Sequence, residues 1–317
     1  ATIGDIELDN NTNFTSSGAG ITLLAATSIT LGVDSFLSSV GNLSATATSG
    51  AVILGNSSYY YSTGNIEIYA SGHVDLGGSV GTAAFFDATG SITISGSISD
   101  VSTLILREDS FITSEDDITV NSAGGYTFIT GSYIDNTAGT GDIYLAPVGT
   151  STAPMTLNLN TYISSGGALT VGSKGVIITG HATQPAYLQS VGNLSASSVD
   201  GDITLGDNSY IYSTAGDVSI AVSGTDNTLD LNGSPSYIQA FSGNVDVTID
   251  DGDLLLEAST EYITASGNVT VDARGVKLES NSSIYTTSGD LTVTVDGRIT
   301  AQTYGVWLSG TSSFTST

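Results

Sequence analysis

The sequence contains no cysteine, which excludes disulfide bonds and cysteine-ligated metal sites. Basic residues are almost as scarce: 5 Lys and Arg stand against 31 Asp and Glu, giving a formal net charge of −26. Nucleic acids and anionic membrane surfaces are bound through clustered cations, so we exclude both as partners. No apolar stretch is long enough for a transmembrane helix, and the first residues lack the basic segment and apolar block of a signal peptide. We therefore expect no membrane insertion.

Glycine is abundant, with 39 residues, and it marks a repeat along the chain. Segments such as GNIEIYA, GSITISG and GNVTVDA read Gly-x-apolar-x-apolar, which is the alternation of a strand with one buried face. The first apolar residue of each repeat comes 22 to 27 residues after the previous one, at positions 21, 43, 66, 92, 118, 143, 169, 194, 218, 245, 269 and 291. We expect a first strand to begin at each of these positions.

Two more short strands follow in each repeat. The second is an apolar-x-apolar pair: Ile29/Leu31, Val52/Leu54, Val74/Leu76, Leu104/Leu106, Tyr126/Phe128, Leu157/Leu159, Val176/Ile178, Ile203/Leu205, Leu229/Leu231, Leu254/Leu256, Val276/Leu278 and Val306/Leu308, with Ile6/Leu8 before the series. The third usually lies six residues further on and reads aromatic-apolar-x-Ser/Thr, as in Phe36-Leu37 and Tyr262-Ile263.

This triple pattern predicts an all-β fold, a parallel β-solenoid in which each repeat forms one coil. A β-sandwich is the rival fold, but it would need turn signals after every strand and would not keep three strands in phase. We expect one continuous solenoid over residues 1–317, without separate caps, of about 13 coils and roughly 60 Å long. Parallel crossovers favour the right-handed form.

An Asn or Asp precedes most of the first strands. These residues are Asn42, Asn65, Asp117, Asp142, Asn193, Asp217, Asn244, Asn268 and Asp290. We expect the glycine that precedes most of them to supply a positive φ, and the side chain to bond either the local backbone or the same residue one coil away. Amides are as frequent as carboxylates here, which favours a structural role over metal binding.

An aromatic residue opens most third strands. Because neighbours in a strand point to opposite faces and the following Ile or Leu keeps the more regular register, we expect these rings to point outward. The column comprises Phe36, Tyr59, Phe111, Tyr133, Tyr162, Tyr187, Tyr210, Tyr237 and Tyr262. Two interpretations are open: coil-to-coil stacking that stabilises the fold, or an exposed stripe that contacts another molecule such as a sugar polymer.

We find no constellation typical of catalysis and predict that the chain is not an enzyme. A β-helix lyase needs a cationic base and a group that neutralises a carboxylate, whereas the cations Arg107, Arg274, Lys277 and Arg298 are spread too widely over the coils to form such a site. Acidic groups in so acidic a chain are expected on a solvated face: Glu108, Asp109, Glu115, Asp116 and Asp117 form one, and Asp246, Asp250, Asp251 and Asp253 another. His73, beside an outward Asp75, and His181 stand alone. We expect no cofactor; calcium is the cation that the Asp246–Asp253 group would bind, although no calcium motif is present.

Strings such as GDITLGDNSYIYSTAGDVSIAV resemble the repeats of filamentous-haemagglutinin-like and autotransporter-type bacterial surface proteins. The resemblance covers the whole chain in period and composition. It implies a secreted, cell-surface protein that serves as a stalk, fibre or adhesin. The alternative is a carbohydrate-binding or polysaccharide-degrading β-helix.

Neither end of the sequence resembles a cap. The first residues match a second and third strand, and the last residues stop where another glycine would be due. We expect the apolar residues of both ends to be covered by a second copy, in a head-to-tail homopolymer, or by more of the same polypeptide. These residues are Ile6, Leu8, Phe14, Val306, Leu308 and Phe314.

Overall fold

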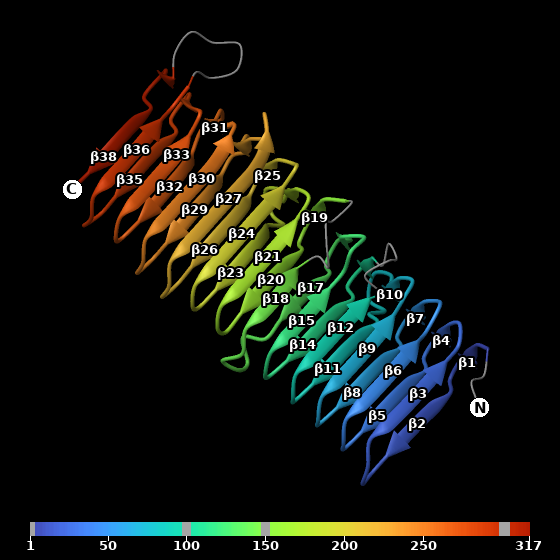
Figure 1. The fold of residues 1–317 in the computed structure, drawn as a ribbon. Coiled ribbons are helices and arrows are strands. Elements are labelled where there is room, and N and C mark those ends of the chain that lie inside the picture. The colour runs from blue at the N-terminus through green and yellow to red at the C-terminus, as the bar shows by residue number, and fades with distance from the viewer. Residues whose placement is uncertain (1–3, 97–102, 147–152, 298–304) are drawn as a thin grey trace. The chain divides into compact units, whose positions relative to one another are not determined.

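Every regular element in the described part of the computed structural model is a β-strand (Figure 1). The structure describes residues 4–96, 103–146, 153–297 and 305–317, and these ranges contain no helix that could span a membrane. Two compact units are present: unit 1 is Ala1–Ala153 with Thr161–Gly166, and unit 2 is Pro154–Asn160 with Gly167–Thr317.

Unit 1 is built from three kinds of strand that recur in order. Its first strands are β3 (Ile21–Ala25), β6 (Leu43–Ala47), β9 (Ile66–Ala70), β12 (Ile92–Gly96), β15 (Ile118–Asn121) and β18 (Ile143–Ala146). Its second strands are β1 (Ile6–Leu8), β4 (Ile29–Leu31), β7 (Val52–Leu54), β10 (Val74–Leu76), β13 (Leu104–Leu106) and β16 (Tyr126–Phe128). Its third strands are β2 (Asn13–Ser16), β5 (Phe36–Ser39), β8 (Tyr59–Ser62), β11 (Phe85–Ala88), β14 (Phe111–Ser114), β17 (Tyr133–Asp135) and β20 (Tyr162–Ser165).

Unit 2 repeats the same scheme. Its first strands are β21 (Leu169–Ser173), β24 (Leu194–Val199), β27 (Val218–Thr225), β30 (Val245–Asp251), β33 (Val269–Ala273) and β36 (Leu291–Val295). Its second strands are β19 (Met155–Leu157), β22 (Val176–Ile178), β25 (Ile203–Leu205), β28 (Leu229–Leu231), β31 (Asp253–Leu256), β34 (Gly275–Leu278) and β37 (Val306–Leu308). Its third strands are β23 (Ala186–Ser190), β26 (Ser209–Ser213), β29 (Ser236–Ala240), β32 (Glu261–Ala265), β35 (Ser283–Thr286) and β38 (Ser313–Ser316).

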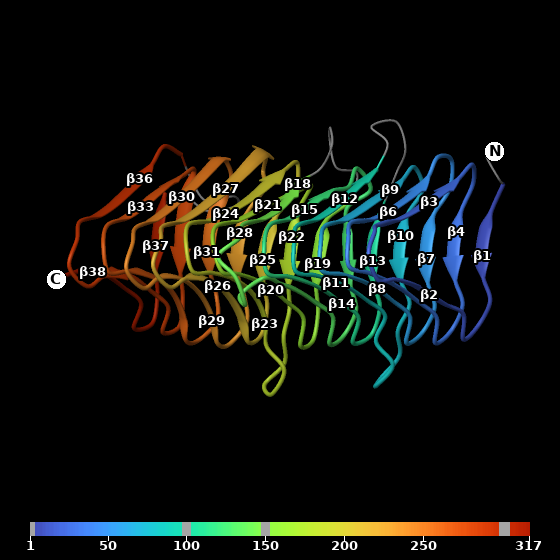
Figure 2. The ribbon, with the colours of Figure 1, turned by 90° about the horizontal axis from the view of Figure 1, so that it is seen from below.

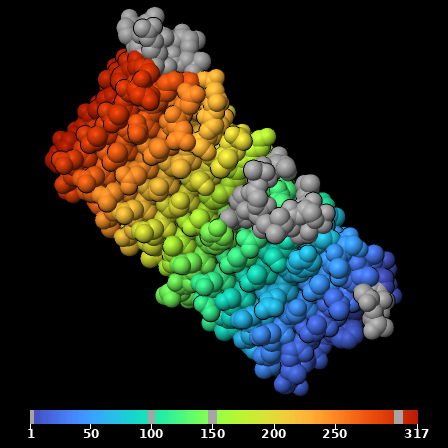
Figure 3. Space-filling model, viewed as in Figure 1, coloured from blue at the N-terminus to red at the C-terminus, as the bar shows by residue number. Residues whose placement is uncertain are grey.

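Strands of one kind lie side by side in successive coils of a unit (Figure 2). The pairing is parallel and in register, so that Ile21 faces Leu43 and Leu43 faces Ile66. The coils pack directly against one another within each unit (Figure 3). The predicted parallel β-solenoid with three strands per coil is therefore confirmed.

The interior is filled by apolar columns. Val269, Val271, Val276, Leu278 and Ile284 are all 0% exposed, as the alternation predicts. The outward side chains of the same strands, Thr270, Lys277 and Tyr285, are partly exposed. One predicted second strand is wrong. In β19, the earliest second strand of unit 2, the inward pair is Met155/Leu157 and not Leu157/Leu159.

The spacing to the third strand explains this correction. Elsewhere the aromatic residue usually follows the second strand by a short turn, as between Leu106 and Phe111. Ending the strand at Leu157 keeps the same turn before Tyr162, whereas ending it at Leu159 would leave too few residues to turn the corner. Leu159 is accordingly only partly buried.

The Asn and Asp side chains before the first strands form a ladder between coils. Asn42 Oδ1 accepts a hydrogen bond from the backbone N–H of Asn65 at 3.1 Å, and Asn244 Oδ1 accepts one from Asn268 at 2.8 Å. Of the two predicted partners, the structure thus selects the residue one coil away. Each such bond adds on the order of 1 kcal/mol of stability.

The predicted positive φ of the glycines before this ladder is wrong. Among the described residues, the glycines with positive φ are Gly81, Gly125, Gly131, Gly224 and Gly310, and none of these precedes a ladder residue. Glycine is needed there because the coils approach closely: a Cβ on Gly64 would lie 2.5 Å from Asn42 Oδ1.

Buried serines near the ends of the third strands fix the same corner. Ser62 Oγ donates a hydrogen bond to the carbonyl oxygen of Gly41, one coil back, at 2.7 Å. It also accepts one from the N–H of Gly64 at 3.0 Å. Ser39, Ser114, Ser165 and Ser213 make the same bond to the previous coil. This explains the Ser or Thr of the third-strand pattern.

In each unit one coil carries a longer turn between its second and third strands, and the turn projects from the corner between those two strands (Figure 2). Each closes with an antiparallel bridge, Ser79 to Thr82 in unit 1 and His181 to Gln184 in unit 2. The extra residues around His181 in the sequence thus form a small hairpin outside the strands.

Replacing Val271 by Asp should destabilise the protein by roughly 3 kcal/mol or more, because the carboxylate would be buried among apolar columns without a partner. Thr292→Asp is the matched control: Thr292 lies on the exposed face of β36 and pairs with Thr270, so its change should stay within about 0.5 kcal/mol. The midpoint of urea unfolding measures both. Equal midpoints for the two variants would contradict the proposed orientation of this strand.

Candidate functional site

The predicted aromatic column points outward. All nine rings are partly exposed, whereas the residue after each ring is buried. Leu37, Ile134 and Ile263, for example, are each 0% exposed. Tyr60 takes this inward position in β8, and its hydroxyl is buried without a hydrogen-bond partner.

In unit 1 the rings of this column stack on one another. From Phe36 through Tyr59 to Tyr162, the stacked pairs have centroid distances of 4.6–5.1 Å and interplanar angles of 3–6°. The distance matches the strand spacing of about 4.8 Å, so in-register pairing itself brings the rings into contact. Because each ring face within the stack is covered by the next ring, a sugar could reach only the edges. This geometry favours the stabilising interpretation in unit 1.

Phe85 is a member of the stack that the sequence pattern missed. It lies between Tyr59 and Phe111, at centroid distances of 4.7 and 4.6 Å. The longer turn before β11 moved it away from the usual spacing. Counting back from the next glycine, Gly90, would have found it, because the third strand keeps its distance to that residue.

In unit 2 the aromatic residues form a broader and less regular group. Tyr237 stacks on Tyr262 at 4.9 Å and 4°, but Tyr210 and Tyr237 are inclined by 25°. Tyr212 and Tyr285, two positions further along their strands, add a second row. Burial, together with the neighbouring tyrosines, raises the pKa of Tyr262 to about 12. The sequence pattern did not single out this second row.

The acidic group proposed for a cation is divided by the structure. Asp246 and Asp250 lie on the exposed face of β30, whereas Asp251 and Asp253 contact Arg274, at 3.2 and 3.4 Å. Asp226 binds the same guanidinium at 2.5 Å. Within the described ranges, no three acidic or histidine side chains are arranged to hold a metal ion.

The remaining charged candidates lie apart. Arg107 binds both carboxylate oxygens of Asp75, at 2.8 and 2.6 Å, and Asp75 is only 7% exposed rather than facing water as expected. Lys277 pairs with Glu257 at 2.8 Å and with Glu279 at 3.4 Å. Arg298 lies outside the described residues.

In the acidic group from Glu108 to Asp117, some carboxylates accept hydrogen bonds from the backbone. Asp109 accepts a hydrogen bond from the N–H of Gly81 at 2.8 Å, and Asp117 belongs to the ladder between coils. These carboxylates thus support turns.

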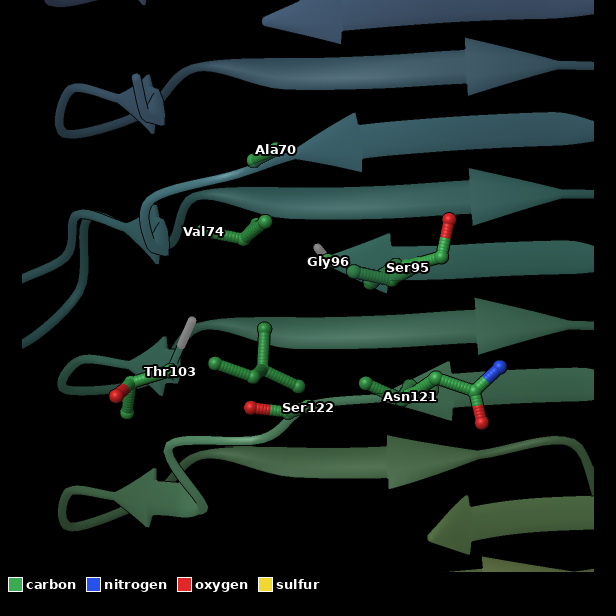
Figure 4. A pocket seen from close by; sticks show the side chains of 10 residues that line it. Ala70, Val74, Ser95, Gly96, Thr103, Asn121 and Ser122 are labelled. Carbon is green, nitrogen blue, oxygen red and sulfur yellow. The ribbon is translucent and has the colours of Figure 1, made fainter. Parts of the chain in front are cut away.

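A small cavity lies in unit 1 beside β9, β12 and β15 (Figure 4). Val74, Ile94, Leu104 and Val120 line it together with small polar residues, and its volume is about 10 Å³. That is room for about one water molecule, so this cavity cannot hold a substrate.

Two surface grooves are larger. One, of about 330 Å³, lies in unit 1 and is lined by Tyr61, Thr113 and three carboxylates, those of Asp87, Glu115 and Asp135. The other, of about 240 Å³, lies in unit 2 beside Lys174, Ile177 and Asp202. A glycosidase needs two carboxyl groups on opposite sides of its substrate. The groove of unit 1 contains several carboxylates, so a test for catalysis should address this groove.

Glu261 is the most unusual titratable residue. It occupies, at the start of β32, a column of buried serines that includes Ser209 and Ser236. The side chain is 0% exposed, and neither carboxylate oxygen has a hydrogen-bond partner of good geometry. Burial, followed by the nearby charges of Asp230 and Glu257, raises its pKa to about 8, although backbone N–H groups nearby offset part of this.

No protein-family model, curated protein or solved structure matches the chain. The function is therefore inferred from the fold and the side-chain arrangement described above.

Glu261 should make stability depend on pH. An unfolded glutamate titrates near pH 4.3, whereas the folded one titrates near pH 8. Folding is thus penalised as pH rises from about 4 to 8, and the penalty is complete above that range. Glu261→Gln should match the wild type near pH 4 and exceed it by a few kcal/mol at pH 9. Urea unfolding across this range measures the difference. A constant difference, or one equal to that of the exposed Glu67→Gln control, would contradict the buried titration.

We expect no turnover of polysaccharides. Incubation with neutral and acidic polysaccharides should release neither reducing ends nor unsaturated products. Activity lost on changing Asp87 or Asp135 in the groove of unit 1, or Asp250 or Asp251 in unit 2, would overturn this prediction.

Proposed function

We propose that the protein is an extracellular structural protein, a fibre subunit or adhesin stalk whose coils associate end to end. The observation that carries the proposal is the exposure of the apolar columns at the two terminal coils. Phe14 is 52% exposed, whereas Leu37, its partner one coil inward, is 0% exposed. Leu308 is 47% exposed, whereas Leu278, its partner, is 0% exposed.

The strand edges of these coils support the same proposal. Among the described strands, β1 and β2 each pair on one side only, and so do β37 and β38. Unpaired edges of parallel strands invite pairing with another chain. The six predicted end residues lie on these strands: Ile6, Leu8, Phe14, Val306, Leu308 and Phe314.

The two terminal surfaces differ in sequence, so a contact between them is heterologous. Such a contact propagates into a filament unless its rotation closes a ring. Further coils of a longer polypeptide would cover the same surfaces by the same pairing. The secreted, cell-surface location rests on the resemblance of the repeats to those of bacterial surface proteins.

Electrostatics should oppose this assembly. Two copies, each with a net charge of −26, repel one another, and salt screens that repulsion. We therefore expect association to strengthen with ionic strength.

Sedimentation velocity over a range of protein and salt concentrations tests end-to-end assembly. The wild type should form species larger than a dimer, and electron micrographs should show filaments. Phe14→Asp or Leu308→Asp should shift the distribution to monomers. Val80→Asp is the matched control, because Val80 is 82% exposed but lies in a turn away from the terminal coils. Monomers alone at high protein and salt concentration would refute the proposal.

A further inference from the structure

The outer face of the third strands in unit 2 carries no charge. From β23 to β35, the outward positions hold only aromatic, amide and hydroxyl side chains, of which only Thr264 is buried: Tyr187, Gln189, Tyr210, Tyr212, Tyr237, Gln239, Tyr262, Thr264, Ser283 and Tyr285. We call this surface the neutral face. The corresponding face of unit 1 contains Asp87 and Asp135. A charge-free surface of five strands is unexpected in a chain with a net charge of −26.

Tyr212 lies on β26, the second strand of the neutral face, and its surroundings differ from the stack in unit 1. Its ring is inclined by 41° to Tyr187, by 45° to Tyr237 and by 78° to Phe241, at centroid distances of 6.1–6.2 Å. Parallel neighbours therefore do not cover its faces as they do in unit 1. Phe241, at the corner after β29, is 51% exposed. Another molecule can therefore contact the ring of Phe241 directly.

Two amides flank Tyr212 in register. Gln189 lies one coil before it and Gln239 one coil after it. The Tyr212 hydroxyl donates a hydrogen bond to Gln189 Oε1 at 2.6 Å, which holds that side chain in place. Within the described residues, the Gln239 side chain makes no hydrogen bond. An amide presents donors and an acceptor together, as a row of sugar hydroxyls requires.

We propose that the neutral face binds an extended neutral polysaccharide. The polymer would cross from one coil to the next and contact Tyr212 and Phe241. Aromatic faces pack against the C–H faces of sugars, while the amides bind their hydroxyls. Successive coils are about 4.8 Å apart, close to the length of one pyranose unit, so successive sugars would lie against successive residues of one row.

Charge selects this occupant over others. An acidic polysaccharide would find no cation on the neutral face and would be repelled by the rest of the chain. A second copy seated here would bring a further charge of −26 to the contact. A neutral polymer meets neither penalty.

This inference does not depend on end-to-end assembly, because the neutral face and the terminal coils share no residue. Binding and filament formation can be lost independently, and each is measured separately.

Affinity electrophoresis in native gels tests the proposal, with soluble hydroxyethyl cellulose, a soluble β-1,3-glucan, a galactomannan and polygalacturonate as probes. At least one neutral polymer should retard the wild type, and polygalacturonate should not. Tyr212→Ser and Phe241→Ser should each weaken that binding at least tenfold. Tyr61→Ser is the matched control, because Tyr61 occupies the same row in unit 1, between Ser38 and Asp87. This variant should bind the polymer as the wild type does.

Three results would overturn the proposal. The first is no retardation by any neutral polymer. The second is equal weakening in Tyr61→Ser and Tyr212→Ser. The third is loss of self-association in Tyr212→Ser without any change in polysaccharide binding, which would make a second copy the occupant. Urea unfolding of each variant distinguishes lost binding from lost folding.

Discussion

In this protein the backbone of each strand is satisfied by the coils before and after it. Strands of only three to eight residues could not stand alone, and parallel pairing fixes them in register. Residues of one column are therefore forced into contact at the strand spacing. The stacked rings, the Asn and Asp ladder and the buried serines all follow from that constraint, because each places a side chain where the same position of the next coil can meet it.

The repeat made much of this fold readable from sequence. All twelve first strands begin at the predicted residues, since the glycine and the alternation mark them locally. The errors arose where the local pattern allowed two registers, as at Leu157, or where a longer turn displaced a ring, as at Phe85. The role of the glycines could not be predicted either, because the space for a Cβ at each glycine before the ladder is limited by the coil before it and not by the sequence of its own coil. Glu261 and Tyr212 were missed for the same reason. Glu261 lies in a column of serines and Tyr212 lies between two glutamines, and these neighbours belong to other coils.

Three of the five basic residues form ion pairs with particular acids. Arg107, Arg274 and Lys277 all bind carboxylates of other coils, and Arg274 binds three of them. Most of the remaining acids are spread over exposed positions, where they repel acidic partners over the surface as a whole. Against that background, the absence of charge on one face of unit 2 distinguishes it more sharply than its apolar character does. Specificity on such a surface comes as much from what the rest of the chain repels as from what the rings attract.

The two projecting turns show how this architecture accommodates added chain. Each is inserted at the corner between a second and a third strand, and the strands that flank them keep the register of their neighbours. Lengthening a loop costs little entropy once its ends are held, so register is insulated from whatever is placed there. That corner is consequently where new recognition segments can be grafted, whether by natural variation or by design, without redesigning the coil that carries them.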